Sequence, residues 1–206
     1  MLPFTRGLAV FLAAALAACS SVRQSQPPRT ATEQLLISKA ADEAARELDL
    51  PLPSGARVFF DVSNFDAIDG KYAIGAIKEH LLRAGARLAF ERAEADVVVE
   101  IRSGAAAIDE SEMLIGTPRY DVPIPFGESF TLPKIALFDI IERKGVAKFA
   151  ATAYDARSGE LIAATGPRFG YSHVRVWTAL VLLTMRSDDL IPEDQREPPI
   201  DLFSGP

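Results

Sequence analysis

Cysteine and histidine are scarce in this chain, with one cysteine and two histidines among 206 residues. The sequence also lacks a Gly-x-Ser-x-Gly elbow, a phosphate-binding loop, a dinucleotide-binding fingerprint and a His-Glu-x-x-His pair. These absences remove the usual signatures of hydrolases, nucleotide-binding enzymes and metalloproteases. His80 falls on the polar side of a predicted helix and is expected to be a surface residue. We therefore predict no enzymatic activity, no cofactor and no bound metal.

Basic residues are outnumbered as well. The chain has 22 lysines and arginines against 28 aspartates and glutamates, for a net charge of −6. Nucleic-acid binding depends on lysine and arginine neutralising phosphates, so we predict no nucleic-acid partner. Hydrophobic residues make up 49% of the chain and charged residues 24%, which is the composition of an ordinary folded domain.

Long apolar runs are also missing. The apolar stretch 7–15 follows Arg6 and is well short of the ~20 residues that a membrane-spanning helix needs. It leads into Leu16-Ala17-Ala18-Cys19, which resembles the lipobox of a bacterial lipoprotein signal peptide. The resemblance implies cleavage before Cys19, a diacylglycerol on its sulfur and a further acyl chain such as palmitate on its amine, so that lipid holds the protein in a membrane. Ser20, in place of aspartate, favours the outer membrane, with the domain facing the periplasm.

Composition divides the chain into four parts. Residues 1–18 are the predicted signal peptide, and the polar residues 19–29, which include a proline pair, are a predicted flexible tether. Residues 30–191 have the length and apolar content of a single α/β periplasmic domain. The acidic, proline-containing residues 192–206 have little to bury and are predicted to be a disordered tail.

Helical periodicity predicts two helices in the domain. The first begins after Thr30, which stands in capping-box relation to Glu33, and ends before Pro51. Its apolar face is rich in alanine, which is typical of close packing against a sheet. The second helix covers 71–84, and Asp69 is its expected N-terminal cap.

Alternating and β-branched runs predict the strands of a mixed sheet. Early strands are predicted at 57–64, 86–91 and 95–104, and a C-terminal antiparallel meander at 135–142, 146–154 and 161–171, with turns at 143–145 and 155–159. Residues 178–185 are expected to be a further extended segment. In the middle strand of the meander, the set that should face the helices is Ala147, Phe149, Ala151 and Ala153. The predicted fold class is α/β (α+β), a single domain with a mixed sheet of about five to six strands and two main helices packed on it.

Residues 109–133 break this pattern. They contain four prolines and scattered apolar residues, and the sequence predicts a long irregular loop, which in a compact domain is usually functional or disordered. The candidate partner-binding residues are its apolar side chains: Met113, Ile115, Phe126 and Phe130. The alternative is that Met113, Ile115 and Phe126 only plug the open end of the core.

Two groups of acidic residues are candidate chemical sites. One group precedes the predicted loop and has the carboxylates for acid–base work: Asp109, Glu110 and Glu112. The other surrounds one strand end and has the oxygens that a hard cation prefers: Asp61, Asp66 and Asp69. The first group is interpreted as a solvated edge. The second lacks the spacing of a dedicated cation-binding loop, so we interpret it as turn and cap residues.

Three segments resemble an uncharacterised family of bacterial lipoproteins that is defined only as a domain of unknown function. They are Thr30-Ala31-Thr32-Glu33-Gln34-Leu35-Leu36, Met113-Leu114-Ile115-Gly116-Thr117-Pro118 and Gly145-Val146-Ala147-Lys148-Phe149. More remotely, the element order and the turn Asp155-Ala156-Arg157-Ser158-Gly159-Glu160-Leu161-Ile162 are similar to the periplasmic domain of curli-secretion and penicillin-binding-protein-activator lipoproteins. The chain is expected to lack the long amphipathic strands that line the curli channel.

These observations favour a non-catalytic, lipid-anchored envelope lipoprotein. Its expected partner is an envelope protein or the cell wall, in an accessory role in envelope assembly, transport or control of a cell-wall enzyme. Two alternatives remain open. One is a periplasmic hydrolase that uses carboxylates near 109–133, and the other is a carrier that holds an apolar ligand with the four candidate side chains of the predicted loop.

Overall fold

The computed structural model describes residues 29–122 and 130–196. Several predictions concern residues outside these ranges. They are those for the signal peptide, Cys19, nearly all of the tether, Phe126 and residues 197–206. The elements in chain order are α2 (Ala31–Arg46), β1 (Arg57–Asp61), α3 (Gly70–Arg83), β2 (Arg87–Leu88), η1 (Arg92–Glu94), β3 (Val97–Thr117), β4 (Tyr120–Val122), β5 (Phe130–Leu132), β6 (Ile135–Asp155), β7 (Leu161–Ala164), β8 (Arg168–Ala179), β9 (Leu183–Asp188) and η2 (Glu193–Gln195).

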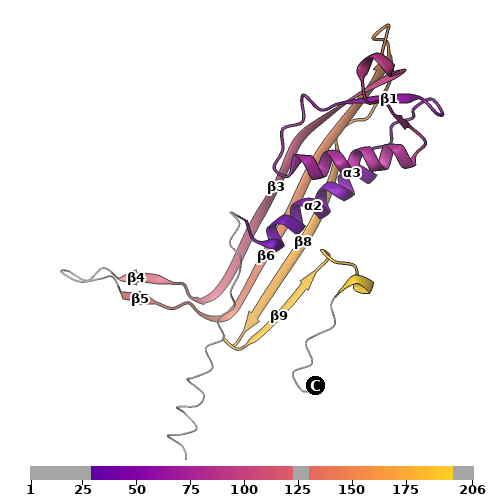
Figure 1. The fold of residues 1–206 in the computed structure, drawn as a ribbon. Helices are drawn as coiled ribbons and strands as arrows, with labels where there is room; N and C mark the ends of the chain where they lie inside the picture. Colours follow the sequence, from indigo (N-terminus) through magenta and orange to yellow (C-terminus); the bar gives the residue numbers. More distant parts are fainter. Residues whose placement is uncertain (1–28, 123–129, 197–206) are drawn as a thin grey trace, which may run out of the picture. The chain divides into compact units, whose positions relative to one another are not determined.

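A mixed sheet of seven strands organises the described part of the chain (Figure 1). Its strands follow the order β2-β1-β3-β6-β8-β9, and β7 also pairs with β6. β1 is parallel to β2 and β3, whereas β3, β6, β8 and β9 are each antiparallel to the next. β4 and β5 form a separate two-stranded antiparallel sheet. The predicted single α+β domain with a mixed sheet and two helices is confirmed, although the main sheet has more strands than predicted.

Glycines in two strands let α2 pack very close to the sheet. A Cβ at Gly145 would lie 2.5 Å from the carbonyl oxygen of Leu36, and one at Gly170 would lie 2.0 Å from that of Ala40. The hydroxyl of Ser172 donates a 2.7 Å hydrogen bond to the Leu36 carbonyl oxygen. The buried face of α2 is mostly alanine. The alanine-rich pattern therefore reflects a helix backbone almost in contact with strand backbone.

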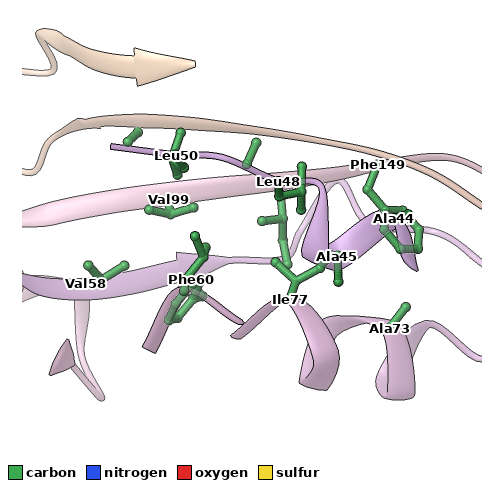
Figure 2. Packing of buried hydrophobic residues seen from close by; sticks show 14 of the residues in the cluster. Ala44, Ala45, Leu48, Leu50, Val58, Phe60, Ala73, Ile77, Val99 and Phe149 are labelled. Carbon is green, nitrogen blue, oxygen red and sulfur yellow. The ribbon is translucent and has the colours of Figure 1, made fainter. Parts of the chain in front are cut away.

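One main apolar core lies between the helices and the sheet (Figure 2). Figure 2 shows Leu48, Phe60 and Ile77 together in it, contributed by the segment after α2, by β1 and by α3. The ring of Phe149 packs against Phe65 at 5.2 Å between centroids. The set predicted to face the helices is confirmed as fully buried: Ala147, Phe149, Ala151 and Ala153.

β1, α3 and β2 form the predicted strand–helix–strand unit. Asp69 precedes α3 at the cap position, but its φ is 56° and its side chain makes no capping hydrogen bond. The predicted side-chain capping role is therefore wrong. The Asp69 carbonyl oxygen instead accepts hydrogen bonds from the amides of Tyr72 and Ala73, as in the first turn of the helix.

β3 and β6 are each 21 residues long, which corresponds to about 70 Å at ~3.3 Å per residue. The prediction of an irregular loop at 109–133 is wrong, because residues up to Thr117 continue β3 in register with β6. The turn predicted at 143–145 is also wrong, since these residues pair with both β3 and β8. The expected absence of long strands is wrong for the same reason.

Cross-strand partners explain why turn-forming and charged residues sit inside these long strands. Arg143 forms an ion pair with Glu110 of β3. The ammonium of Lys144 lies 4.3 Å from the centre of the Tyr171 ring on β8. Each charge is thus accommodated by a neighbouring strand. None of these partners is adjacent in sequence, so the local pattern alone reads as a turn.

A bulge at Gly104 changes which residues of β3 face the helices. Ser103 pairs with Phe149, and Ala105 pairs with Lys148, so one residue of β3 has no counterpart. The alternation of side chains therefore shifts by one position along the strand. Beyond the bulge, the helix-facing residues of β3 include Ala106, whose partner Ala147 is buried.

The C-terminal strands also differ from the prediction. The predicted strand 161–171 is two strands, β7 and β8, separated at Pro167, which has no amide hydrogen to donate. The predicted extended segment 178–185 is a hairpin, in which Leu180 and Val181 turn with φ of 51° and 67° before β9 begins. The short helix η2 occupies part of the region predicted as a tail.

Candidate interaction surface

The two faces of the main sheet differ in what covers them. Gly145 and Ser172 point to α2, so their neighbours in sequence point to the opposite side. We call that opposite side the open face. Tyr171 and Lys144 lie on it, and both are exposed.

Two rows of mainly large apolar side chains cross the open face over four strands. The register pairs β3 with β6, β6 with β8 and β8 with β9, and residues in one row point to the same side. The first row is Met113, Ile140, Trp177 and Met185, and the second is Ile115, Phe138, Ala179 and Leu183. We call these eight residues the apolar patch.

The apolar patch is largely open to solvent. Five of its eight residues are exposed, from 39% for Trp177 to 64% for Met185, with Met113, Ile115 and Leu183 between them. The other three are half-buried: Phe138, Ile140 and Ala179. The adjoining β8–β9 turn adds Leu180 and Leu182, which are 67% and 86% exposed. Contiguous exposed apolar surface in a folded domain marks a site of contact with another molecule.

The next positions on the open face are polar and aromatic. Glu142 and Arg175 form a 2.7 Å ion pair beside the apolar patch. Further along, the rings of Phe169 and Tyr171 stack with 6.3 Å between their centroids, and Lys148 lies 5.5 Å from the centre of the Phe169 ring. The ion pair therefore gives the apolar patch a polar border on one side.

The structure brings together two of the four predicted partner-binding residues. Met113 and Ile115 are neighbours in the apolar patch, but they lie on β3 and not in a loop. Phe130 lies on β5 in the separate two-stranded sheet and is 56% exposed. Met113 and Ile115 do not plug the core, because each of them exposes more than half of its surface.

The sequence pattern missed the β8 and β9 members of the apolar patch. Trp177 and Met185 come next to Met113 only through the register of four strands. The one signal available was the apolar run that ends at Leu183, and its periodicity could not distinguish a strand from a helix.

The carboxylates weighed for acid–base chemistry do not converge. Asp109 points to the open face, whereas Glu110 and Glu112 lie on the helix side of β3. Glu110 pairs with Arg143, and Glu112 pairs with Lys134. Each glutamate thus has a cationic partner of its own, which is typical of strand-stabilising pairs.

Lys134 links two carboxylates on the helix side of the sheet. Its ammonium donates hydrogen bonds to Asp139 and to Glu112. These bonds, the one to Asp139 most of all, raise the pKa of Lys134 above its usual range. Asp139 is 6% exposed, and its Oδ2 lies 2.6 Å from the Lys134 Nζ. Its Oδ1 has no hydrogen-bond partner within the described residues. The ion pair compensates for burial of the Asp139 carboxylate.

Asp61, one of the three candidate cation ligands, is engaged by a residue close to it in sequence. Asp61 accepts hydrogen bonds from the hydroxyl and the amide of Ser63, and these bonds lower the pKa of the Asp61 carboxyl. Across residues 29–122 and 130–196, no three His, Cys, Asp or Glu side chains stand together as a metal site would require.

The comparisons with known proteins give a family. The sequence matches the family described as "Family of unknown function (DUF6655)" over residues 13–176. The chain belongs to the DUF6655 family. Neither a curated protein nor a solved structure matches it. The predicted membership of a family of unknown function is confirmed, whereas the likeness to curli-secretion and penicillin-binding-protein-activator lipoproteins has no support from these comparisons.

A separate hollow of about 770 Å³ lies at the start of both helices of this DUF6655 protein, lined by Gln34, Leu35 and Ser38 of α2 and by Lys71 and Tyr72 of α3. None of the predicted binding residues described by the structure lines it. Within the described ranges, no helix has the length and the apolar character needed to cross a membrane.

Proposed function

We propose that this DUF6655 protein is a non-catalytic, lipid-anchored lipoprotein of the bacterial outer membrane. Its domain faces the periplasm and binds a partner in the envelope through the apolar patch. The role is an accessory one, in assembly, transport or control of a cell-wall enzyme.

The observation that carries this proposal is the exposure of the apolar patch. Met113 and Met185 each expose more than half of their surface, and transfer of such surface from water contributes roughly 25 cal/mol per Å² to binding. Trp177 lies between them in the same row, and tryptophan is among the residues that most often dominate interface energies. Burial of this surface against a partner would therefore favour binding.

The anchor is supported by the sequence around Cys19. The family match begins at residue 13, so it includes Cys19 together with the folded domain. If Cys19 carries the lipid, Cys19→Ala should abolish incorporation of labelled palmitate and leave an unlipidated precursor, because the chain has no other thiol to take the diacylglycerol. Palmitate labelling of the Cys19→Ala variant at the wild-type level would contradict the anchor.

The binding role is tested by site-specific photo-cross-linking in intact envelopes. A photoreactive amino acid at Met113 should give discrete cross-linked products, because that side chain lies in the apolar patch. Leu161 on β7 is the matched control, since it is an aliphatic side chain with 64% exposure outside the patch. Equal products from both positions, or none from Met113, would contradict a binding role for the patch.

A further inference from the structure

In the part of the chain that the structure describes, no strand lies beside most of the outer edge of β3 or beside the outer edge of the six-residue β9. β1 pairs with β3 only over Val97–Glu100, so the outer edge of β3 is open from Arg102 to Thr117 among the described residues. β9 is the last strand at the other side of the sheet. An open edge presents unpaired amide and carbonyl groups and is a template for pairing with another strand.

Between the bulge at Gly104 and the irregularity at Ile115/Gly116, the β3 edge has no lysine or proline, and neither does the six-residue β9. Natural edges are often blunted by lysine, proline or a strong bulge. The β3 edge runs through Glu112, Met113, Leu114 and Ile115. Both edges are therefore able to accept a strand over several residues.

The two edges also match each other at the same level of the sheet. On the open face, Met113 and Ile115 of β3 share rows with Met185 and Leu183 of β9. On the other face, Glu112 of β3 and Arg186 of β9 share a row. Within one copy Glu112 pairs with Lys134 and Arg186 pairs with Asp188, so each would gain a second partner of opposite charge. Apolar side chains thus meet apolar ones, and opposite charges meet, when one edge is laid beside the other.

We propose that copies of this chain join head to tail, with β3 of one copy paired to β9 of the next. The strand directions agree with this arrangement. β3, β6, β8 and β9 run alternately up and down, so β9 of a neighbouring copy with the same orientation would be antiparallel to β3. The contact is heterologous, so it generates either a closed ring or an open filament. The proposal rests on the binding function proposed above, since it names the partner of the same apolar patch.

A second copy fits this surface better than lipid does. Lipid tails would cover the side chains of the apolar patch, but they cannot hydrogen-bond the amides and carbonyls of two open edges. A strand from another copy would cover the apolar side chains and also hydrogen-bond the backbone groups of the edge. Each copy supplies the two complementary edges, so no other protein is required.

Disulfide trapping in the full chain tests the pairing. Ser111 and Ser187 share one row at opposite edges, and both are exposed. Within one copy they are separated by three strand spacings, about 14 Å at ~4.8 Å each. A disulfide needs Cα atoms about 4–7 Å apart, so a bond between these positions forms only between copies.

The variants are made in a Cys19→Ala background, which removes the native thiol and makes the result independent of the lipid anchor. After mild oxidation, Ser111→Cys/Ser187→Cys should give a ladder of dimers, trimers and larger species on a non-reducing gel. A mixture of the two single variants should give dimers only. The control Ser111→Cys/Ser54→Cys should give no ladder, because Ser54 lies in a turn before β1.

Three results would overturn the proposal. One is a double variant that stays monomeric at the concentration found in envelopes. Another is a single variant, Ser111→Cys or Ser187→Cys, that dimerises as efficiently as the mixture, which would indicate like edges pairing with each other. The last is binding to phospholipid vesicles without any ladder. In the first and the last case the absence of the ladder refutes self-assembly, while Met113 photo-cross-links to a different protein would leave the binding function intact.

Discussion

Two glycines decide how closely α2 lies on the sheet. A Cβ at Gly170 would meet the backbone of α2 at 2.0 Å from the Ala40 oxygen and 2.3 Å from the Ala44 nitrogen. Neither atom is at the end of a flexible side chain, so the helix would have to move away from β8. We expect Gly170→Ala to lower the free energy of unfolding by roughly 1–3 kcal/mol or more, as measured by denaturant unfolding of the purified protein.

Gly75 supplies the matched control for that substitution. It lies in α3, and a Cβ there would meet nothing within 4 Å. Alanine is favoured over glycine inside a helix by up to ~1 kcal/mol, so Gly75→Ala should leave the protein equally stable or make it more so. A similar loss in both variants would show that the packing of α2 is not the cause.

Asp155 makes part of the stability depend on pH. Hydrogen bonds from the amides of Ser158 and Arg157 hold the pKa of the Asp155 carboxyl below its usual value of 3.8. A lowered carboxyl pKa stabilises the fold above about pH 4, and this contribution is lost as the pH falls through the lowered pKa. Asp155→Ala should therefore lower the melting temperature at pH 7, and the difference from wild type should shrink toward pH 2–3.

Asp109→Ala is the control for that pH series. Asp109 is exposed on β3, and its side chain makes no hydrogen bond or ion pair within the described residues. Its replacement should leave the melting temperature nearly unchanged across the same pH range. A pH-independent difference for Asp155→Ala would refute the carboxylate as the source of the effect.

At the scale of elements, the long strands contain both exposed and buried apolar residues. Met113 on β3 and Phe130 on β5 are more than half exposed, whereas Phe149 on β6 is fully buried. Met113→Ala and Phe130→Ala should each change the free energy of unfolding by only about 0.5 kcal/mol. Phe149→Ala should cost about 3–5 kcal/mol. Thermal and denaturant unfolding of the three variants would contradict the proposed surface if Met113→Ala approached the cost of Phe149→Ala.

The helices and the inward face of β6 were predictable because local patterns determine them. The alanine-rich stripe of α2 and the alternation from Ala147 to Ala153 need only the nearest neighbours in sequence. The length of β3 and β6 was not predictable in this way. Arg143 and Gly145 read locally as a turn, and only their partners on β3, β8 and α2 make them strand residues.

The same limit applies to the apolar patch. Met113 and Ile115 were selected as exposed apolar residues, and the structure places them so. Their neighbours Trp177 and Met185 depend on the register across β6 and β8, which includes the bulge at Gly104. A single-residue bulge reverses the face of every later residue of β3. Sequence alternation alone could not place the patch.

At the scale of the whole molecule, the open face raises the question of whether the chain covers its own apolar patch. The folded unit begins at Ala31, after a first unit of residues 1–30, and its core residues start within α2. The polar residues 20–28 contain two glutamines and two prolines and offer little apolar surface to bury. The sequence therefore predicts that this segment adds little to the stability of the folded unit.

Deletion of residues 20–28 tests that conclusion in the Cys19→Ala chain that carries Ser111→Cys/Ser187→Cys. If the segment is only a tether, the thermal midpoint should stay within about 1 °C of the parent, because no buried area is lost. The yield of the disulfide ladder should also be unchanged. A fall of several degrees would place the segment on the folded unit. A ladder that forms only after the deletion would mean that residues 20–28 occupy the edge of β3 or β9 themselves, in which case the apolar patch is closed in the free protein and opens only when that segment is displaced.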